Sequence, residues 1–219
     1  MIALVIGASL ESIYAITNAK KMKLEVYAFD GDCDAPGLKI ADKGFVTDIR
    51  NPKNIIDILS FEKIIPDIVL PVPIGRYLVS GASINDYYKL KGVSEKIADI
   101  CTDKYLFHKI LNDAGLRDAT CKLIKSETKL ENICDISLRY PVIIKPRYGS
   151  GSRGVTVACS YIELKRELIE RIENTETQTL NEDYIVEDMI EGKEYGLDAV
   201  IENGVFKLVL LRGKILTEP

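Results

Sequence analysis

The first 90 residues alternate short apolar runs with helical patterns. Four apolar runs have the length and turn-bounded ends of parallel strands buried on both faces. They are IALVIGAS, LEVYAF, the weaker GFVTDI, and DIVLPV. Asn51 followed by Pro52 predicts an N-cap and first helical residue for a helix that runs through Leu59. This alternation is typical of βαβ units and predicts a Rossmann-like α/β domain with a parallel sheet over residues 1–92.

The sequence predicts one helix between the first two apolar runs and two more helices after the sheet. The segment between the first two runs places four residues on one helical face: Leu10, Ile13, Tyr14 and Thr17. Beyond the sheet, Ser94 is a candidate cap of one helix and Thr102 of a second, which ends at Gly115. These two helices predict a helical connector over residues 93–118.

From about residue 119 the pattern changes to short strands. They are CKLIKS, PVIIKP, VTVACS and YIVED. An amphipathic helix lies among them, with Leu164, Leu168 and Ile172 on one stripe. Two longer runs, YGLDAVI and VFKLVLL, flank Asn203-Gly204, which is the strongest short hairpin signal. The pattern predicts an antiparallel α+β subdomain over residues 119–219.

The composition narrows the protein class. With 219 residues, 47% of them hydrophobic and 28% charged, the chain is long enough for one or two packed domains. A net charge of −4 gives no support for binding to nucleic acid or a membrane surface. Five scattered cysteines without a CxxC pair favour reduced thiols in a cytoplasmic protein. A single histidine, His108, argues against a histidine-based zinc site.

The segment PVIIKPRYGSGSRGV joins a strand pattern to a glycine-rich stretch. Glycines without Cβ atoms let a ligand approach the backbone closely. They are Gly149, Gly151 and Gly154. The cations Lys145, Arg147 and Arg153 indicate that this ligand is negatively charged. The segment is no Walker A loop, because its lysine precedes the glycines. The alternative is an ordinary surface hairpin with a basic edge.

Two further segments carry candidate nucleotide contacts. After the first strand, GASLES has only Gly7 of a GxGxxG fingerprint, so Asp30 either binds a ribose or caps a loop of a scaffold. The segment YIVEDMIEGKEYGLD ends a strand in acids and continues through a turn to Glu194. Such a strand end presents backbone groups to an adenine ring, and a later carboxylate holds ribose hydroxyls. The alternative for Glu187 and Asp188 is a solvated strand end.

Three segments together resemble the ATP-grasp superfamily, which includes carbamoyl phosphate synthetase, biotin carboxylase and D-alanine–D-alanine ligase. They are TDKYLFHKILNDAGL, KPRYGSGSRGV and VEDMIEGKEYGLD, in that order. The first 90 residues look like the scaffold domain that precedes the ATP-grasp domain in this superfamily. The resemblance therefore covers nearly the whole chain.

The resemblance implies a set of site residues. Lys104 and Lys145 would contact the nucleotide phosphates. A loop would cover them, formed by Tyr148, Gly149, Ser150, Gly151, Ser152 and Gly154. A hinge beside adenine would act mainly through its backbone, at Glu187, Asp188, Met189 and Ile190. Glu194 would hold the ribose. Lys145 would be catalytic, joined by Arg212 and Lys214 near the γ-phosphate or acyl phosphate, although an edge-strand basic pair explains the last two equally well.

The implied activity is an ATP-dependent carboxylate–amine, or carboxylate–nucleophile, ligase that forms an acyl phosphate. Mg²⁺ would assist, with ligands expected beyond Pro219, so we expect the chain to be an N-terminal portion with little activity alone. The expected partners are small carboxylate and amine substrates and a second copy in a homodimer, with no nucleic acid or membrane. The alternatives are a non-catalytic nucleotide-binding module and a nicotinamide-dependent oxidoreductase.

Overall fold

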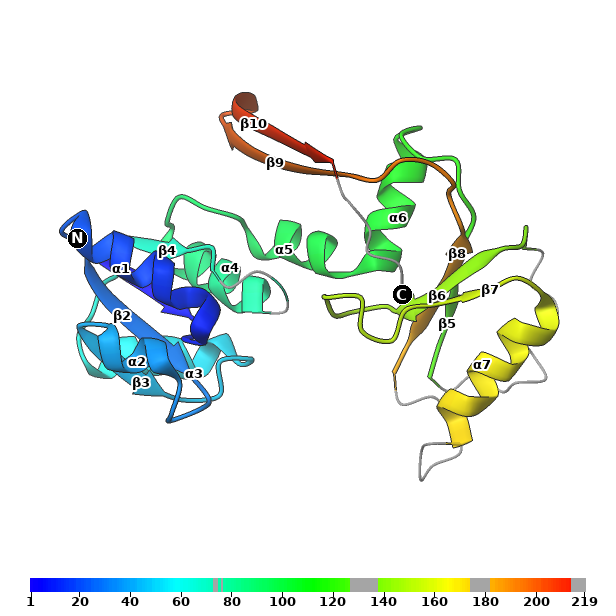
Figure 1. Cartoon of the computed structure of the whole chain (residues 1–219). Coiled ribbons are helices and arrows are strands. Elements are labelled where there is room, and N and C mark those ends of the chain that lie inside the picture. The colour runs from blue at the N-terminus through cyan, green and yellow to red at the C-terminus, as the bar shows by residue number, and fades with distance from the viewer. Residues whose placement is uncertain (73–74, 76, 127–137, 174–181, 214–219) are drawn as a thin grey trace.

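The computed structural model describes residues 1–72, 75, 77–126, 138–173 and 182–213. Two separate sheets lie at opposite ends of the molecule, with a helical segment between them and a long hairpin above it (Figure 1). None of the described helices is long and apolar enough to cross a membrane.

The first sheet is parallel, as the apolar runs predict. Its four strands lie in the order β3-β2-β1-β4. The strands are β1 (Ile2–Ile6), β2 (Glu25–Asp30), β3 (Lys43–Val46) and β4 (Ile68–Leu70). The helical segments are η1 (Leu10–Ser12), α1 (Ile13–Lys21), α2 (Pro36–Ile40), α3 (Pro52–Phe61) and α4 (Tyr77–Tyr88). The Asn51 side chain accepts a hydrogen bond from the Lys53 amide, which confirms the predicted cap of α3.

Both faces of the two central strands, β1 and β2, are buried, which explains why the middle residues of these strands are apolar. Leu4 and Phe29 pack with Ile55 and Leu59 of α3 on one face. Val5 and Val26 pack on the other face with Ile16 of α1. The packed side of α1 therefore differs from the predicted face. Ile16 and Ala19 are buried, whereas Leu10 and Tyr14 are exposed.

Two helices, α5 (Glu95–Thr102) and α6 (Lys104–Asp113), connect the sheets. The predicted cap of α6 is one residue early. Asp103, not Thr102, occupies the N-cap, and its carboxylate accepts hydrogen bonds from the amides of Tyr105 and Leu106. Ser94 does occupy the N-cap of α5, but its side chain makes no capping hydrogen bond. Gly115 has a φ of 67° just beyond α6, as expected of a glycine that ends a helix.

The second sheet is antiparallel and has the order β5-β8-β6-β7. Its strands are β5 (Cys121–Ile124), β6 (Val142–Pro146), β7 (Thr156–Ala158) and β8 (Tyr184–Asp188). Helix α7 (Tyr161–Glu173) packs on one face, and its predicted stripe of Leu164, Leu168 and Ile172 is buried there. The opposite face of this sheet is the one that carries Lys145 and Glu187.

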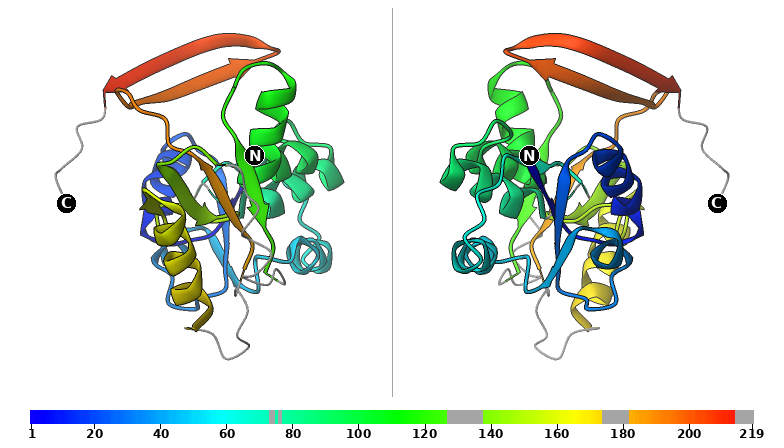
Figure 2. Two further views of the ribbon diagram at one scale, coloured as in Figure 1. Left: turned by 90° about the vertical axis from the view of Figure 1, so that its right-hand side faces the viewer. Right: turned by 90° about the vertical axis from the view of Figure 1, so that its left-hand side faces the viewer.

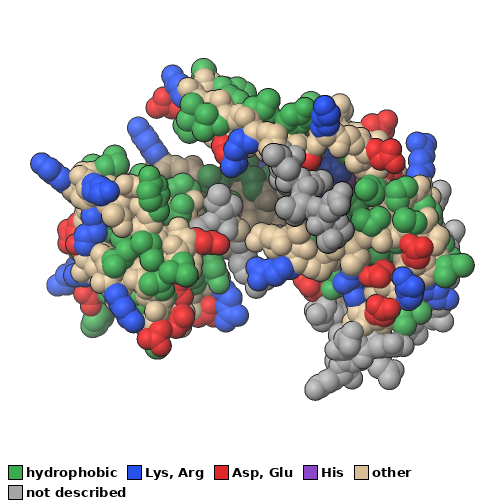
Figure 3. Space-filling view, viewed as in Figure 1, with side chains coloured by type: hydrophobic (Ala, Val, Ile, Leu, Met, Phe, Trp, Pro, Cys, Tyr) green, Lys and Arg blue, Asp and Glu red, His purple; other side chains and the backbone are tan. Residues whose placement is uncertain are grey.

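The last two strands, β9 (Tyr195–Glu202) and β10 (Val205–Gly213), form the hairpin predicted from Asn203-Gly204. Asn203 has a φ of 51° and Gly204 a φ of 75°, the pair of positive values that a type I′ turn requires. Among the described strands, these two pair only with each other. The successive residues Leu210 and Leu211 are both exposed, so the hairpin presents apolar side chains on both faces. Figure 2 shows the hairpin across the top of the molecule in both side views, and Figure 3 shows hydrophobic side chains along the face turned to the viewer.

Candidate functional site

A lysine and a glutamate from neighbouring strands meet on the face of the second sheet that lies opposite α7. Ile143 lies opposite Glu187 in the β6–β8 register, so Lys145 is a diagonal neighbour of Glu187 on the same face. The Lys145 Nζ atom donates a hydrogen bond of 2.5 Å to Glu187 Oε1. The strand pairing alone therefore places these two side chains together.

Glu187 is buried, with 4% of its surface exposed, and it is surrounded by cationic and imidazole groups. Arg117 Nη2 lies 3.4 Å from its second oxygen, and His108 Nε2 lies 3.3 Å from the same atom. Lys145 and Arg117 supply the positive charge that a buried carboxylate needs. Glu187 is therefore not a solvated strand end, and its side chain, not only its backbone, belongs to the site.

The sequence analysis did not single out His108 or Arg117 as partners of Glu187. Burial lowers the pKa of His108 below its ordinary value, and nearby Arg117 lowers it further, so the neutral imidazole is favoured. Burial, followed by the charge of Glu187, raises the pKa of Cys121 to about 12. His108, Cys121 and Glu187 have ligand atoms within 4.8 Å of one another. A protonated thiol beside two cations is nevertheless a poor metal site, because Zn²⁺ needs the thiolate.

Lys104, the first residue of α6, lies against the glycine-rich loop. Its Nζ atom donates to the carbonyl oxygen of Gly149 at 2.8 Å and to that of Arg147 at 3.4 Å. Burial lowers the pKa of Lys104, and the charge of Lys145 lowers it further. The two ammonium groups are close enough to repel each other, so an anion bound beside both is electrostatically favoured.

Arg147 has a structural role rather than the anion-binding role suggested by the sequence. Its guanidinium forms two hydrogen bonds with the Asp103 carboxylate, of 3.0 and 2.6 Å, and a third of 3.0 Å with Asp183. The Tyr148 hydroxyl also donates to Asp103, at 3.2 Å. With two acids as partners, the charge of Arg147 is already neutralised. These contacts fasten the start of the glycine-rich loop to the first turn of α6.

The glycines of the loop allow backbone conformations with positive φ. Gly149 and Gly151 have φ values of 105° and 72°, and a Cβ at either would meet no atom within 4 Å. The requirement at both positions is therefore the left-handed backbone rather than space. The remaining predicted loop residues, Ser150, Ser152 and Gly154, are exposed. Beside the loop lies a cavity of about 610 Å³ lined in part by Lys104, Tyr148, Gly149 and Ser150.

Two backbone amides of the predicted adenine hinge already form hydrogen bonds within the protein. The Asp188 amide donates to the Thr120 carbonyl, and the Met189 amide donates to the Pro141 carbonyl, each at 3.1 Å. The Asp188 carboxylate accepts a hydrogen bond of 2.9 Å from the Thr120 amide. The Ile190 amide donates to no residue that the structure describes, and the Ile190 side chain is exposed. Of the hinge amides after Glu187, that of Ile190 is the one left for a ligand.

Two of the remaining predicted residues, Glu194 and Arg212, have exposed side chains. Glu194 is exposed between β8 and β9. Arg212 on β10 forms an exposed ion pair with Asp198 of β9, at 2.5 Å, and has no contact with Lys104 or Lys145. The structure thus favours the edge-strand explanation for Arg212. Lys214 lies outside the described residues.

Asp30 closes a loop in the first sheet. One carboxylate oxygen accepts a hydrogen bond of 2.6 Å from the Ala8 amide, and the other accepts one of 2.9 Å from the Asp32 amide. Both oxygens therefore have backbone partners. This agrees with the interpretation of the first sheet as a scaffold rather than as a dinucleotide site.

The match to a known family covers α7, the hairpin and three strands of the second sheet, β6, β7 and β8. Residues 138–216 match the model described as "ATP-grasp domain". This segment is therefore similar to an ATP-grasp domain. The matched segment includes Lys145, the glycine-rich loop, Glu187 and Glu194.

Curated relatives match more than half of this chain. The chain is 30% identical over 144 residues to the carbamoyl phosphate synthase large chain of Thermotoga neapolitana, covering 62% of this chain and 13% of that protein. It is 26% identical over 148 residues to the formate-dependent phosphoribosylglycinamide formyltransferase of Prochlorococcus marinus, covering 64% of this chain and 35% of that protein. The chain thus spans only a minor part of these relatives.

Solved structures share the fold over nearly the whole chain. The L-amino acid ligase of Bacillus licheniformis superposes with a TM-score of 0.72 at 17% identity, covering 97% of this chain and 50% of that one. The N5-carboxyaminoimidazole synthetase of Staphylococcus aureus, solved with ADP, gives 0.71 at 18% identity, covering 95% and 53%. An α/β domain followed by ATP-grasp strands is therefore the fold of this chain, as the sequence predicts.

Proposed function

We propose that the ATP-grasp domain binds ATP, with the triphosphate held between Lys104, Lys145 and the glycine-rich loop. The convergence of the two ammonium groups at the base of that loop supports the proposal most strongly. Each ammonium has three N–H donors. Glu187 accepts from Lys145, and two loop carbonyls accept from Lys104, so donors remain for phosphate oxygens. A bound phosphate would also offset the repulsion that lowers the pKa of Lys104.

The adenine would lie beside the end of β8. The Ile190 amide would donate to a ring nitrogen, since the amides of Asp188 and Met189 are already used within the sheet. Glu194, four residues on, would accept hydrogen bonds from the ribose. The backbone amides of the glycine-rich loop, from Tyr148 to Gly154, would close over the phosphates.

The proposed reaction is carboxylate ligation, an activity in keeping with the ligases and synthases among the relatives. A carboxylate oxygen attacks the γ-phosphorus, the bond to the β,γ-bridging oxygen breaks, and ADP leaves. An amine nitrogen then attacks the acyl carbon of the acyl phosphate, phosphate leaves, and the amine loses a proton. Positioning and charge stabilisation by Lys104 and Lys145 would be the main contributions of the residues described here. Closure of the loop would exclude water from the acyl phosphate.

Magnesium chemistry is not assigned to the described residues. Mg²⁺ takes carboxylate and water oxygens in near-octahedral geometry. The carboxylates of Asp103 and Asp183 pair with Arg147, and Glu187 pairs with Lys145 and Arg117. These three acids are therefore poor candidates, and the expectation that metal ligands lie beyond Pro219 stays a prediction. The substrate carboxylate and amine, and a homodimer, stay predictions too.

Calorimetric titration of the protein with ATP, ADP and NADH tests the nucleotide site. We expect ATP and ADP to bind and NADH not to bind. Lys145→Gln should weaken ATP binding at least 10-fold. Lys122 is an exposed lysine on β5 of the same sheet, and Lys122→Gln should leave ATP binding unchanged. Equal effects of the two substitutions would contradict the proposed phosphate site. A screen of carboxylic acids and amines for ATP-dependent phosphate release would then test the ligase reaction separately.

A further inference from the structure

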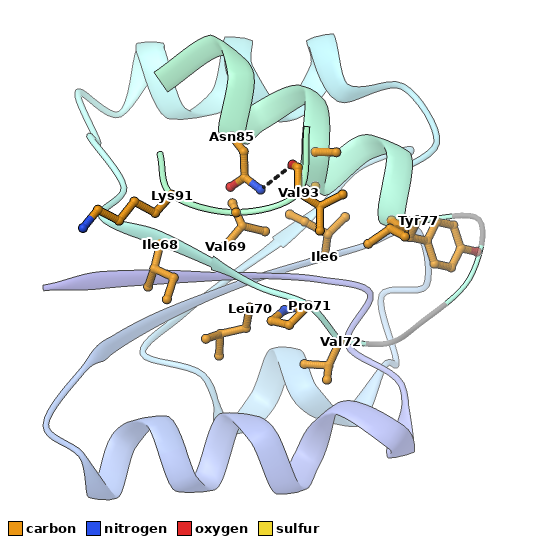
Figure 4. Close-up of a pocket in the computed structure, with 14 residues that line it drawn as sticks. Ile6, Ile68, Val69, Leu70, Pro71, Val72, Tyr77, Asn85, Lys91 and Val93 are labelled. Carbon is orange, nitrogen blue, oxygen red and sulfur yellow. Dashed lines mark hydrogen bonds between the residues drawn. The ribbon is translucent and has the colours of Figure 1, made fainter. Parts of the chain in front are cut away.

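Buried polar atoms without a hydrogen-bond partner occur, among other places in the described chain, beside an apolar cavity and beside an ion pair. In the first domain, Asn85 of α4 faces an aliphatic cavity, and its Nδ2 atom donates to the Val93 carbonyl at 3.1 Å (Figure 4). Its unpaired Oδ1 atom is enclosed by protein, so a ligand in that cavity would not reach it. Beside the second sheet, the unpaired atoms belong to His108 and Arg117, which lie around the charged side chain of Glu187.

The carboxylate of Glu187 is shared between two cations. Its Oε1 atom accepts the hydrogen bond of 2.5 Å from Lys145, and its Oε2 atom accepts one of 3.4 Å from Arg117 Nη2. Among the described residues, Glu187 is the only acid with which Arg117 forms an ion pair. Two positive charges therefore face one negative charge. Because burial and Arg117 lower the pKa of His108, the imidazole adds no further charge, and the group as a whole stays positive.

The backbone on either side of Arg117 keeps its side chain at this place. Arg117 lies between the end of α6 and the start of β5, with 25% of its side chain exposed. The Asn112 side chain of α6 donates to the Ala119 carbonyl at 3.2 Å. The Thr120 amide donates to the Asp188 carboxylate at 2.9 Å. The connection is thereby tied both to α6 and to the end of β8.

Sharing the carboxylate changes what Lys145 can offer to a ligand. Without Arg117, both oxygens of Glu187 would be free to turn toward Lys145. They would then use more of the three N–H donors of the ammonium and neutralise its charge. With Oε2 held by Arg117, Lys145 stays anchored by one oxygen and keeps donors and positive charge for an anion.

We propose that Arg117 is a positioning residue of the nucleotide site, which holds one oxygen of Glu187 so that Lys145 keeps the place and the charge needed to bind a phosphate group. This inference rests on the proposed binding of ATP phosphates by Lys145. Arg117 does not itself contact the nucleotide in this arrangement. Its effect on ATP affinity therefore passes entirely through Lys145.

A double-mutant cycle tests this dependence, with ATP affinities measured by calorimetry. We expect Arg117→Gln to weaken ATP binding about 5- to 10-fold, a typical coupling within one charged network. Arg117→Lys keeps the charge and should lose less. In the Lys145→Gln background, Arg117→Gln should cause no further loss. Arg166 of α7 forms an exposed ion pair on the other side of the sheet, so Arg166→Gln is the matched control and should leave ATP affinity unchanged.

His108 provides a second measurement that needs no nucleotide. It is the only histidine of the chain, so its imidazole NMR signals need no further assignment. Burial lowers the pKa of His108, and the positive charge of Arg117 lowers it further. Arg117→Gln should therefore raise the pKa of His108, whereas Arg166→Gln should leave it unchanged. The melting temperature shows whether each variant folds, and Arg117→Met replaces Arg117→Gln in both experiments if the latter does not fold.

Three results would overturn the proposal. They are unchanged ATP binding in Arg117→Gln, an effect of Arg117→Gln that persists in full in the Lys145→Gln background, and an unchanged pKa of His108 in folded Arg117→Gln. Failure of the proposed function itself looks different. In that case the wild type does not bind ATP, or Lys145→Gln binds ATP as the wild type does, and the role of Arg117 falls with it.

Discussion

The Lys104 ammonium donates a hydrogen bond of 2.8 Å to the carbonyl oxygen of Gly149, which lies 45 residues further along the chain. This bond joins the first residue of α6 to the glycine-rich loop. The Lys104 backbone amide adds a bond of 3.2 Å to the Arg147 carbonyl. Helix and loop are thereby held together at the point where we place the triphosphate.

Lys104→Gln separates binding from stability. Burial and Lys145 already lower the pKa of Lys104, so its charge contributes little to the folded state. We expect the free energy of unfolding to change by less than about 1 kcal/mol, the net contribution of one hydrogen bond. ATP affinity should fall at least 10-fold. Urea unfolding and calorimetry measure the two quantities, and a large loss of stability with intact ATP binding would refute this role for Lys104.

Glu187→Gln should destabilise the fold. It removes the carboxylate that neutralises Lys145 and Arg117, and breaking a buried ion pair costs about 3 kcal/mol or more. Asp198→Asn is the matched control, since Asp198 pairs with Arg212 on the exposed hairpin and such pairs contribute about 0–1 kcal/mol. Urea unfolding measures the free energy of unfolding of both variants. If Glu187→Gln lowers it as little as Asp198→Asn does, Glu187 is not the central partner that the geometry indicates.

The Asp103–Arg147 pair makes stability depend on pH in the acid range. Burial alone would raise the pKa of Asp103, but hydrogen bonds from Arg147 and the Leu106 amide hold it below its ordinary value. The unfolded chain therefore binds the proton more readily, and the stabilisation is present above about pH 4 and lost below it. We expect Asp103→Asn to be less stable than wild type at neutral pH and the difference to shrink as the pH falls.

Unfolding measured at neutral pH and at about pH 3 checks this prediction. Asparagine is itself a good N-cap, so Asp103→Asn isolates the charge, whereas Asp103→Ala should cost about 1 kcal/mol more through the lost cap of α6. A difference between wild type and Asp103→Asn that stays constant with pH would show that the ion pair with Arg147 does not stabilise the fold.

Gly151→Ala tests the conformation of the loop. Gly151 has a φ of 72°, and an alanine there is strained by about 1–2 kcal/mol even though its Cβ would meet no atom. The loop should move away from this conformation, and we expect ATP affinity to fall by about 5- to 20-fold. Gly213→Ala on β10 lacks a positive φ and should leave affinity unchanged. The opposite order of effects would mean that the loop does not act on the nucleotide.

The sequence predicted the elements with strong local patterns. The apolar runs gave the parallel sheet, and the stripe of Leu164, Leu168 and Ile172 gave α7. It was less informative where tertiary contacts decide. Leu10 and Tyr14 suggested a face of α1, but the sheet packs on Ile16 and Ala19. Helix α4 was not assigned, because many of its residues, among them Gly81, Asn85 and Asp86, are weak helix formers.

The residues of the candidate site also divide into those that local motifs predict and those that only tertiary packing brings together. Lys104, Lys145 and the loop glycines follow from local motifs, and the structure brings them together. The grouping of His108 and Arg117 around Glu187 depends on how α6 packs on the second sheet, which no local pattern reports. Arg147 was assigned to the ligand from its position beside the glycines. Its real partners, Asp103 and Asp183, lie 44 and 36 residues away.

A crystal structure of the protein with a non-hydrolysable ATP analogue tests the central claim most directly. We predict phosphate oxygens within hydrogen-bonding distance of both the Lys104 and the Lys145 ammonium groups, beneath the glycine-rich loop, with the adenine at the Ile190 amide. A nucleotide bound elsewhere, for example at Asp30 in the first sheet, would contradict it.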